Sequence, residues 1–423
     1  MKIRLLVIIG IAIIGISLSQ FFFVYRISSR FRLELDRNYE SEKHVSSVKP
    51  LATPRFPLYG TFGFDHFCPW VSKALKREKT NCTLVGQLPY DSTEGVSAWV
   101  SNVVETQLLA RQTNCKLLIR YTNDGSTVDM DHIFMPVSKY ENWSIHSKSW
   151  DCQRNLLCFQ MDSSLSFQLR HQSSLERILP TLAQVPSYRS EVMTMSEFYR
   201  GKHNFNQLSE NLPGFEFGAG FACSIQSLFQ VSPSQLKKTQ IARVLSILRD
   251  PHNLVISLYI RTGVADQKHN VETLEQQVVY KEVSQDVIAC ALYHEKLLYE
   301  NSGRYDRVVW LAISDSPFLK QWIVNTYNKK PIKNNNVGNK QRQVITTTAT
   351  RSRHSRPQNQ PLSKDVADAL LDWYLLGECN IMIYRGSISF GRMAALRTMR
   401  PLYEAGSNTC KRDLFGYSHT LPN

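Results

Sequence analysis

Strand-like and helix-like segments alternate along the second half of the sequence, and this alternation limits the fold more than any other feature. Such alternation predicts a parallel, doubly wound α/β sheet. Sheets of this kind bind ligands beyond the carboxyl ends of their strands. The apolar runs of buried-strand length are residues 254–260, 308–313, 344–348 and 380–384, and the helical patterns are residues 281–299, 316–327 and 364–377, with a further helix starting near Phe390.

Three polar loops follow strands of this predicted sheet. They are Arg261-Thr262-Gly263, Ser314-Asp315-Ser316 and residues 385–392. Because the carboxyl ends of parallel strands share one edge, we expect the loops to converge on a single rim. Each loop alone is a weak signal, and the predicted convergence makes the rim a candidate ligand site.

The last of these loops has the composition of a phosphate site. The first N–H groups of a helix lack internal partners, and the helix dipole adds partial positive charge there. Ser387 and Ser389 offer hydroxyl donors, Gly391 permits close approach, and Arg392 supplies a cation. The alternative is an ordinary strand-to-helix turn with Ser389 as the N-cap and nothing bound.

Two other motifs are candidate binding sites. Gly218 and Gly220 precede an apolar stretch, where glycines either let a backbone approach a ligand or form a tight turn. Asp129 and Asp131 form an Asp-x-Asp pair, which can hold a divalent cation on nucleotide phosphates or be two loop acids. Because the rim offers phosphate sites that need no metal, and no zinc-ligand spacing occurs, we predict no metal ligand.

The first half gives a fainter pattern. Residues 96–113 carry apolar positions at helical spacing, and residues 116–121 read as a buried strand. Helix followed by strand again suggests an α/β domain. The sequence therefore divides into a tail and membrane span, a stem, a first α/β domain and a second α/β domain, at residues 1–25, 26–54, 55–214 and 215–423 respectively.

The net charge of +14 is compatible with nucleic acid, a membrane surface or an anionic substrate. The chain lacks zinc-finger spacing and RNA-binding aromatic patterns, so nucleic acid is the weakest of the three. Much of the charge lies in residues 328–361, either a solvated segment or a flap over an anionic ligand.

Residues 5–25 are apolar enough to span a bilayer as an uncleaved signal anchor. Flanking positive charges do not decide the orientation. Sequons at Asn81 and Asn142 and nine cysteines favour a lumenal body in the secretory pathway. We expect local disulfides in the oxidising lumen, whereas buried cysteines such as Cys290 and Cys379 can instead be small hydrophobes; the expected pairs are Cys152 with Cys158 and Cys68 with Cys82.

The segments VISLYIRTG, WLAISDS and DWYLLGECNIMIYRGSISFGRMAALRT, in this order and spacing, resemble the second half of the GT-B fucosyltransferases. That superfamily contains the α1,6-, α1,2- and protein O-fucosyltransferases. The similarity covers roughly residues 215–398, beginning with GAGFAC. It implies two Rossmann-like domains facing a cleft.

The resemblance also implies roles for particular residues. Arg261 would bind the diphosphate of GDP-fucose, and Asp315 would lie near the nucleoside. Ser387, Ser389 and Gly391 would hold phosphate. The family works without a metal, in agreement with the prediction that the Asp-x-Asp pair is not a metal site.

The sequence departs from the family in three places. Tyr259 stands where the family has histidine, and Val264 stands where it has aspartate. Residues 92–96 replace an expected glycine-rich loop. These changes permit an unusual donor or loss of catalysis.

The prediction is a type II Golgi transferase that moves fucose from GDP-fucose to a glycan or glycoprotein hydroxyl, with inversion. Candidate general bases are Asp266, and less specifically His269 and Glu272, each of which can also be an exposed loop residue. The alternatives are another nucleotide sugar on the same fold, or an inactive membrane-anchored glycan-binding protein.

Overall fold

The fold is seen in a computed structural model, and the chain divides into two compact units. One contains Met1–Ala52 with Ser407–Thr409, and the other contains Thr53–Gly406 with Cys410–Asn423. The elements below belong to the second unit, apart from Thr409. The structure describes residues 64–69, 71, 83–87, 95–113, 116–123, 126–128, 130–137, 143, 158–161, 187–191, 217–238, 240–263, 272–300, 304–328, 342–348, 362–385, 388–407 and 409–413.

Several predictions therefore fall outside the described residues. The apolar run at residues 5–25 is one, and the two sequon asparagines, Asn81 and Asn142, are others. Within the described part of the chain, no helix has the length and apolar character needed to cross a membrane.

The largest described sheet has six strands in the order β11-β10-β9-β12-β13-β14. Neighbouring strands from β11 through to β13 run parallel. Numbered from β9, this is the order 3-2-1-4-5-6 of Rossmann sheets, with the switch point between β9 and β12. The strands are β9 Asn253–Ile260, β10 Arg307–Ser314, β11 Arg342–Thr346, β12 Ile381–Arg385, β13 Leu402–Gly406 and β14 Thr409–Asp413.

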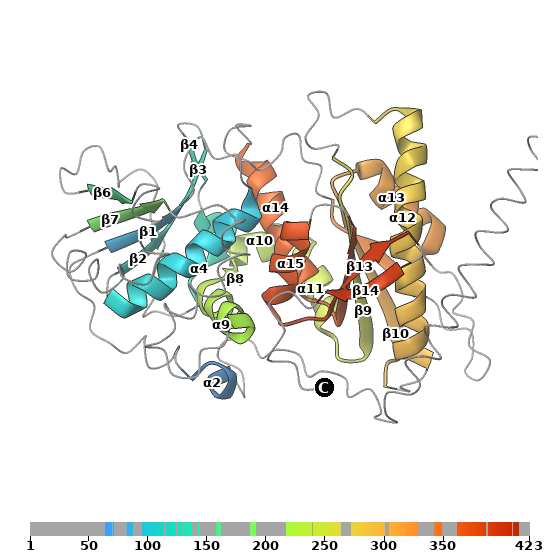
Figure 1. The fold of residues 1–423 in the computed structure, drawn as a ribbon, viewed down its shortest axis with the longest axis horizontal. Coiled ribbons are helices and arrows are strands. Elements are labelled where there is room, and N and C mark those ends of the chain that lie inside the picture. The colour runs from blue at the N-terminus through green and yellow to red at the C-terminus, as the bar shows by residue number, and fades with distance from the viewer. Residues whose placement is uncertain are drawn as a thin grey trace, which may run out of the picture. The chain divides into compact units, whose positions relative to one another are not determined.

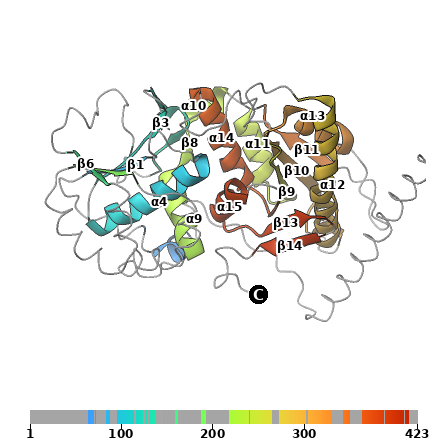
Figure 2. The same cartoon turned by 45° about the horizontal axis from the view of Figure 1, so that its top comes forward.

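Helices cover both faces of this sheet (Figures 1 and 2). On β9, Leu254 and Ile256 face the cluster that includes α12 and α13, whereas Val255 and Tyr259 face the cluster that includes α11, α14 and α15. This period-two alternation of buried residues produces the doubly wound arrangement. The helices are α11 Ile241–Arg249, α12 Leu274–Glu295, α13 Pro317–Tyr327, α14 Ser363–Leu376 and α15 Ile388–Leu396, and a π-helix, Lys296–Glu300, continues α12.

The predicted second half is confirmed in type and order, and two helix starts move. The helix expected from residue 281 begins at Leu274, because Thr273 and Gln276 form a capping box upstream of the apolar pattern. The last helix begins at Ile388 instead of Phe390. Ser316 caps α13, and its side chain accepts a hydrogen bond from Leu319 N–H at 2.9 Å.

The first half contains a second parallel sheet, of four described strands in the order β2-β1-β7-β6. The predicted helix is confirmed as α4, Val96–Thr113, and it packs on β1. Trp99 of α4 stacks on Phe229, with ring centroids 5.7 Å apart. The strands are β1 Thr83–Gln87, β2 Lys116–Ile119, β6 Cys158–Met161 and β7 Ser187–Glu191.

Shorter elements complete the described chain. The predicted strand at residues 116–121 is interrupted at Arg120, and Tyr121 opens a separate hairpin strand. The remaining elements are α2 Phe64–Phe67, β3 Tyr121–Asn123, β4 Ser126–Val128, the 3₁₀ helix Met130–His132, β5 Phe134–Met135, α9 Phe217–Leu228, β8 Gln230–Val231 and α10 Pro233–Lys238.

One predicted local disulfide is wrong, because Cys68 bonds to Cys223, 155 residues away, and not to Cys82. The other, Cys152 with Cys158, stays a prediction, since Cys152 lies outside the described residues. Cys290 bonds to Cys410 and is not an unpaired hydrophobe. Cys379 is buried and free, as expected, and burial raises the pKa of its thiol to about 11. Tertiary packing brings these cysteines together, which sequence separation cannot reveal.

Candidate active site at the carboxyl rim of the sheet

The candidate site lies at the switch point, where β9 and β12 run side by side. Their pairing extends beyond the end of β9, because Arg261 N–H donates to Arg385 O at 3.3 Å. After β9 the chain continues to β10, the neighbour of β9 in the sheet, whereas after β12 it continues to β13, on the opposite side of the switch point. Open α/β sheets bind ligands in the crevice outside this point. The loops after β9 and β12 therefore hold the positions where ligand contacts are expected.

The Arg261-Thr262-Gly263 loop is held by the carboxylate of Asp315, at the end of neighbouring β10. Asp315 Oδ1 accepts hydrogen bonds from Thr262 N–H at 2.7 Å and from Thr262 Oγ1 at 2.9 Å. Asp315 Oδ2 accepts from Gly263 N–H at 2.9 Å. Gly263 has a φ of +86°, which favours glycine. Two of the three predicted loops are therefore joined directly.

Arg261 is fixed by the same carboxylate. Its Nε lies 3.5 Å from Asp315 Oδ2, and its side chain is 14% exposed, against 2% for Asp315. A guanidinium carries five N–H donors, and the ion pair with Asp315 is made through Nε. The structure thus puts an oriented cation at the rim. It gives Asp315 a positioning contact with this loop, and the nucleoside contact implied by the resemblance stays a prediction.

Glu272 reaches the same loop region from the start of α12. Its Oε2 accepts a hydrogen bond from Ser316 Oγ at 3.0 Å. Ser314 Oγ in turn donates to Ile260 O at 2.7 Å and ties β10 to β9. Glu272 is therefore engaged with the cap of α13. The other candidate bases, Asp266 and His269, lie outside the described residues, as does Val264.

The turn from β12 into α15 forms the third part of the rim. Gly386 and Ser387 lie outside the described residues, and Ser389 is half-buried in the first turn of α15. At the strand end, Arg385 forms an ion pair with Asp286 and donates from Nη1 to Val283 O at 3.3 Å. The first N–H groups of a helix have no partner within the helix and can bind anions, and the nine-residue α15 starts at this switch point.

Gly391 permits close packing between α15 and β9. A Cβ at this position would lie 3.2 Å from Tyr259 Cδ1. Phe390 stacks on the same ring, with centroids 5.3 Å apart. Gly391 is therefore closely packed against the core of the protein, and the predicted approach of a phosphate stays a prediction.

Arg392 contacts the C-terminal strand. Its Nε donates to Asp413 Oδ2 at 2.7 Å, and Tyr384 Oη donates to the same oxygen at 3.1 Å. Burial, and then the charge of Asp413, raise the pKa of Tyr384 above its usual range, so its hydroxyl remains a donor. Arg392 thus forms an ion pair that anchors β14, and its phosphate role stays a prediction.

The two glycines of the GAG segment are in a helix, contrary to the predicted turn before one. Gly218 and Gly220 occupy the first turn of α9, and Gly220 is buried. Burial of the apolar run that follows outweighs the low helix propensity of glycine, so the helix starts at Phe217. A ligand-binding glycine turn is therefore replaced by a helix N-terminus.

A hollow beside the rim was missed by the sequence analysis. At the end of β11, Thr347 Oγ1 donates to Asp372 Oδ1 at 2.7 Å, and Lys320 Nζ donates to Thr347 O at 3.3 Å. The useful signal was the run of threonines at a strand's carboxyl end. The hollow is lined by Gln240, Ile241, Val244, Thr346, Thr347, Thr348, Asp368, Leu371 and Asp372.

The Asp-x-Asp pair forms no described metal cluster. Asp129 lies outside the described residues, and Asp131 is partly exposed in the 3₁₀ helix Met130–His132. Among the residues that the structure describes, potential metal ligands gather elsewhere, at Cys290, His294 and Cys410.

The fold and rim define a mixed α/β protein with a Rossmann-order sheet. No protein-family model matches the sequence, and no curated protein matches it either. Among solved structures, a mutant of Arabidopsis thaliana FUT1 in complex with GDP is similar over 90% of this chain and 82% of its own, with 15% identity and a TM-score of 0.49. NodZ alpha-1,6-fucosyltransferase soaked with GDP-fucose is similar over 80% of this chain and 99% of its own, with 12% identity and a TM-score of 0.42. Fucosyltransferase NodZ from Bradyrhizobium, in its Se-Met form, is similar over 78% and 95%, with 12% identity and a TM-score of 0.41.

Proposed function

We propose that this protein is a glycosyltransferase that moves fucose from GDP-fucose to a hydroxyl of a glycan or glycoprotein, with inversion. The observation that carries the proposal is Arg261, held by Asp315 beside the switch point of a Rossmann-order sheet. The resemblance of residues 215–398 to GT-B fucosyltransferases supports the choice of donor. A glycan acceptor is part of the proposal, and its identity and linkage are open.

The proposed chemistry needs stabilisation of the leaving group more than of the sugar. As the bond to fucose breaks, negative charge grows on the β-phosphate of GDP. Arg261 and the first N–H groups of α15 would neutralise it, with hydroxyls from Ser387 and Ser389. These groups supply charge stabilisation without a bound cation. Asp266 is the proposed base that takes the acceptor proton.

The cellular setting belongs to the same proposal. A signal anchor at residues 5–25 and sequons at Asn81 and Asn142 support a type II Golgi membrane protein with a lumenal body. The proposed GT-B arrangement has an acceptor-side domain at residues 55–214 and a donor domain at residues 215–423. The membrane contact is made through the N-terminal span, and no nucleic acid is expected.

Tyr259 supports a second candidate, a glycan-binding protein without transfer activity. The ring is 6% exposed and stacked on Phe390, so the position where the family has histidine holds a packed aromatic group. This departure from the family pattern supports a protein that binds glycans and has lost transfer activity. A transferase for another nucleotide sugar remains a further alternative on the same fold.

Nucleotide binding tests the donor directly. The full chain in detergent is melted with GDP, UDP and ADP, and we expect GDP alone to raise the melting temperature. A rise with UDP alone would replace the proposed donor. Release of GDP from GDP-fucose in the presence of mixed glycan acceptors then separates a transferase from a binding protein.

Arg261 tests the site. A planar guanidinium holds two phosphate oxygens at once, which an ammonium cannot copy. We expect Arg261→Ala to fold and to lose about 10²–10³ in turnover, the cost of one preorganised donor. Arg261→Lys should recover little. A folded Arg261→Ala variant with full GDP release would remove the basis of the proposal.

A further inference from the structure

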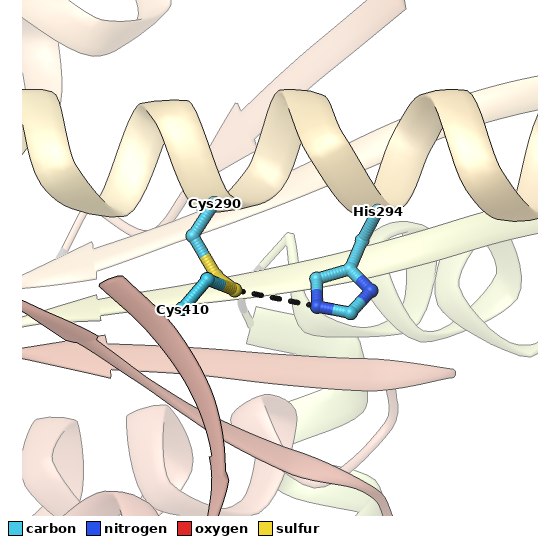
Figure 3. Close-up of side chains that lie close together, drawn as sticks. All are labelled: Cys290, His294 and Cys410. Atoms are coloured by element: carbon cyan, nitrogen blue, oxygen red, sulfur yellow. Dashed lines mark hydrogen bonds between the residues drawn. A yellow bond between two sulfur atoms is a disulfide. The ribbon is translucent and has the colours of Figure 1, made fainter. Parts of the chain in front are cut away.

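Three potential metal ligands meet on the face of the large sheet that α12 covers. Cys290 and His294 are four residues apart on α12, so they project from one side of the helix. Cys410 comes from β14, 120 residues after Cys290. Figure 3 shows the imidazole of His294 directed at the paired sulfurs. None of the three side chains belongs to the rim loops, and the proposed transfer does not use them.

The spacing of the three ligand atoms suits a single small cation. Cys410 Sγ lies 3.4 Å from His294 Nε2, and all three ligand atoms lie within 4.8 Å of one another. Zinc bonds of about 2.0–2.3 Å in a tetrahedron place neighbouring ligand atoms roughly 3.5 Å apart. The histidine and Cys410 therefore already have the required separation. Once the disulfide is reduced, the two sulfurs need only move from their bonded distance to this ligand spacing.

The histidine side chain is held in place beside the sulfurs. The ring of Tyr403 packs against the imidazole of His294, with centroids 3.9 Å apart, and restricts its orientation. An imidazole held in a fixed orientation is a prepared metal ligand.

The charge and access of the cluster also suit zinc. Cys290 and His294 are 2% and 3% exposed, whereas Cys410 is only partly buried. Two thiolates and one Zn²⁺ have no net charge, which avoids the cost of an uncompensated buried charge. Cys410 provides the side from which an ion and a water ligand can enter.

We propose that Cys290, His294 and Cys410 form a zinc site that alternates with the Cys290–Cys410 disulfide. A dithiol reductant supplies two electrons and two protons, breaks the S–S bond and is itself oxidised to a disulfide. Zn²⁺ then binds both sulfurs and His294 Nε2, and the two thiol protons pass to solvent. Water occupies the fourth position. The oxidised protein holds no metal there.

Cobalt titration of the full chain tests this site, because cobalt reports sulfur ligation by its charge-transfer absorption. The chain is reduced with a phosphine, and Co²⁺ and then Zn²⁺ are added. We expect one tight equivalent whose absorption disappears when Zn²⁺ displaces Co²⁺. Without reduction, that equivalent should be missing.

Variants test whether this tightly bound equivalent of metal lies at the cluster. Cys410→Ser and His294→Gln should each weaken it on the order of 100-fold, because each removes one of three ligands. Cys379→Ser and Cys68→Ser are matched controls, which remove a buried thiol and a cysteine of the other disulfide, and they should bind as wild type. Near-UV circular dichroism of each metal-free variant checks the fold.

Two results would overturn the proposal. One is the absence of a tight equivalent in reduced wild type. The other is equal affinity in wild type, Cys410→Ser and His294→Gln, which would place the metal on other cysteines. Neither result bears on GDP binding, so the proposed transferase activity stands or falls separately.

Discussion

Asp315 binds Thr262 twice through one carboxylate oxygen, which accepts from the backbone N–H at 2.7 Å and from the hydroxyl at 2.9 Å. The two residues come from adjacent strands of the parallel sheet, β9 and β10. A buried carboxylate between two strand ends fixes their relative positions. It also sets the direction in which Arg261 leaves the sheet.

Asp315→Asn should therefore uncouple the Arg261 loop while preserving shape. The amide keeps one acceptor oxygen and turns an NH₂ group toward the N–H donors of the loop. The variant therefore loses hydrogen bonds to a charged acceptor, each worth about 1.5–3 kcal/mol. We expect weaker GDP binding by about tenfold or more, equivalent to about 1.4 kcal/mol. Isothermal titration with GDP measures it.

Thr262→Val is the matched control for that prediction. It removes the hydroxyl bond and keeps the backbone N–H bond to Asp315. Its loss of GDP affinity should be clearly smaller than that of Asp315→Asn. If the valine variant is as weak as the asparagine variant, the threonine hydroxyl has a direct ligand role that the carboxylate does not explain.

Glu378 gives a pH-dependent prediction. It accepts from Arg249 Nε at 3.0 Å and from Arg397 Nη2 at 2.8 Å. Burial alone would raise the pKa of Glu378, but the charges of Arg397 and Arg249 outweigh it and lower the pKa from 4.5 to about 2. A carboxyl with a depressed folded-state pKa stabilises the protein above its unfolded pKa. That stability is lost as the pH falls.

Glu378→Gln should cost about 3–5 kcal/mol near neutral pH, because it leaves the buried guanidinium of Arg397 and the partly buried one of Arg249 without their counter-charge. The difference from wild type should shrink as the pH falls from 4.5 to about 2, the window between the two pKa values. Urea unfolding at several pH values measures this. A constant difference across the window would show that Glu378 is not the titrating group.

Gly377 ends α14 against α15. A Cβ there would lie 2.6 Å from Ala394 O and 2.8 Å from Arg397 Nε. Since backbone oxygen cannot move aside cheaply, Gly377→Ala should destabilise the fold by about 1–3 kcal/mol. Gly86→Ala is the comparison, because its Cβ meets Val103 no closer than 3.4 Å. Equal melting temperatures for the two variants would contradict the predicted clash.

Chelation tests the metal-free chemistry of the rim. Transfer in non-reducing buffer should survive EDTA, because cationic and N–H donors neutralise the diphosphate. Asp131→Ala should be as active as wild type. Loss of activity in EDTA that manganese or magnesium restores, together with an inactive Asp131→Ala variant, would return the Asp-x-Asp pair to the site.

Local patterns predicted the large sheet well. The runs that became β9, β10 and β12 are almost continuously apolar because helices cover both faces, so they stand out from their polar loops. Helix starts were less certain, since the capping box at Thr273 lies in a weakly periodic stretch. The position of Arg261 at the rim also followed from the strand rule alone.

Contacts between distant segments were beyond the sequence. Nothing near Arg392 indicated that Asp413 would hold it, because β14 reaches it only after the sheet is assembled. The pairing of Cys68 with Cys223 and the hollow near Asp372 have the same origin. These features depend on which helices pack on which face of the sheet, and local sequence patterns do not reveal that packing.

The disulfide between Cys290 and Cys410 also determines how a proteolytically nicked chain behaves. It joins α12 to the last strand across 120 residues, a span that contains β10, β11, β12 and β13. A protease that cuts once anywhere within this span leaves two fragments that are still one covalent molecule. The oxidised protein, once nicked there, migrates intact on a non-reducing gel and keeps its sheet strands tethered for religation or refolding.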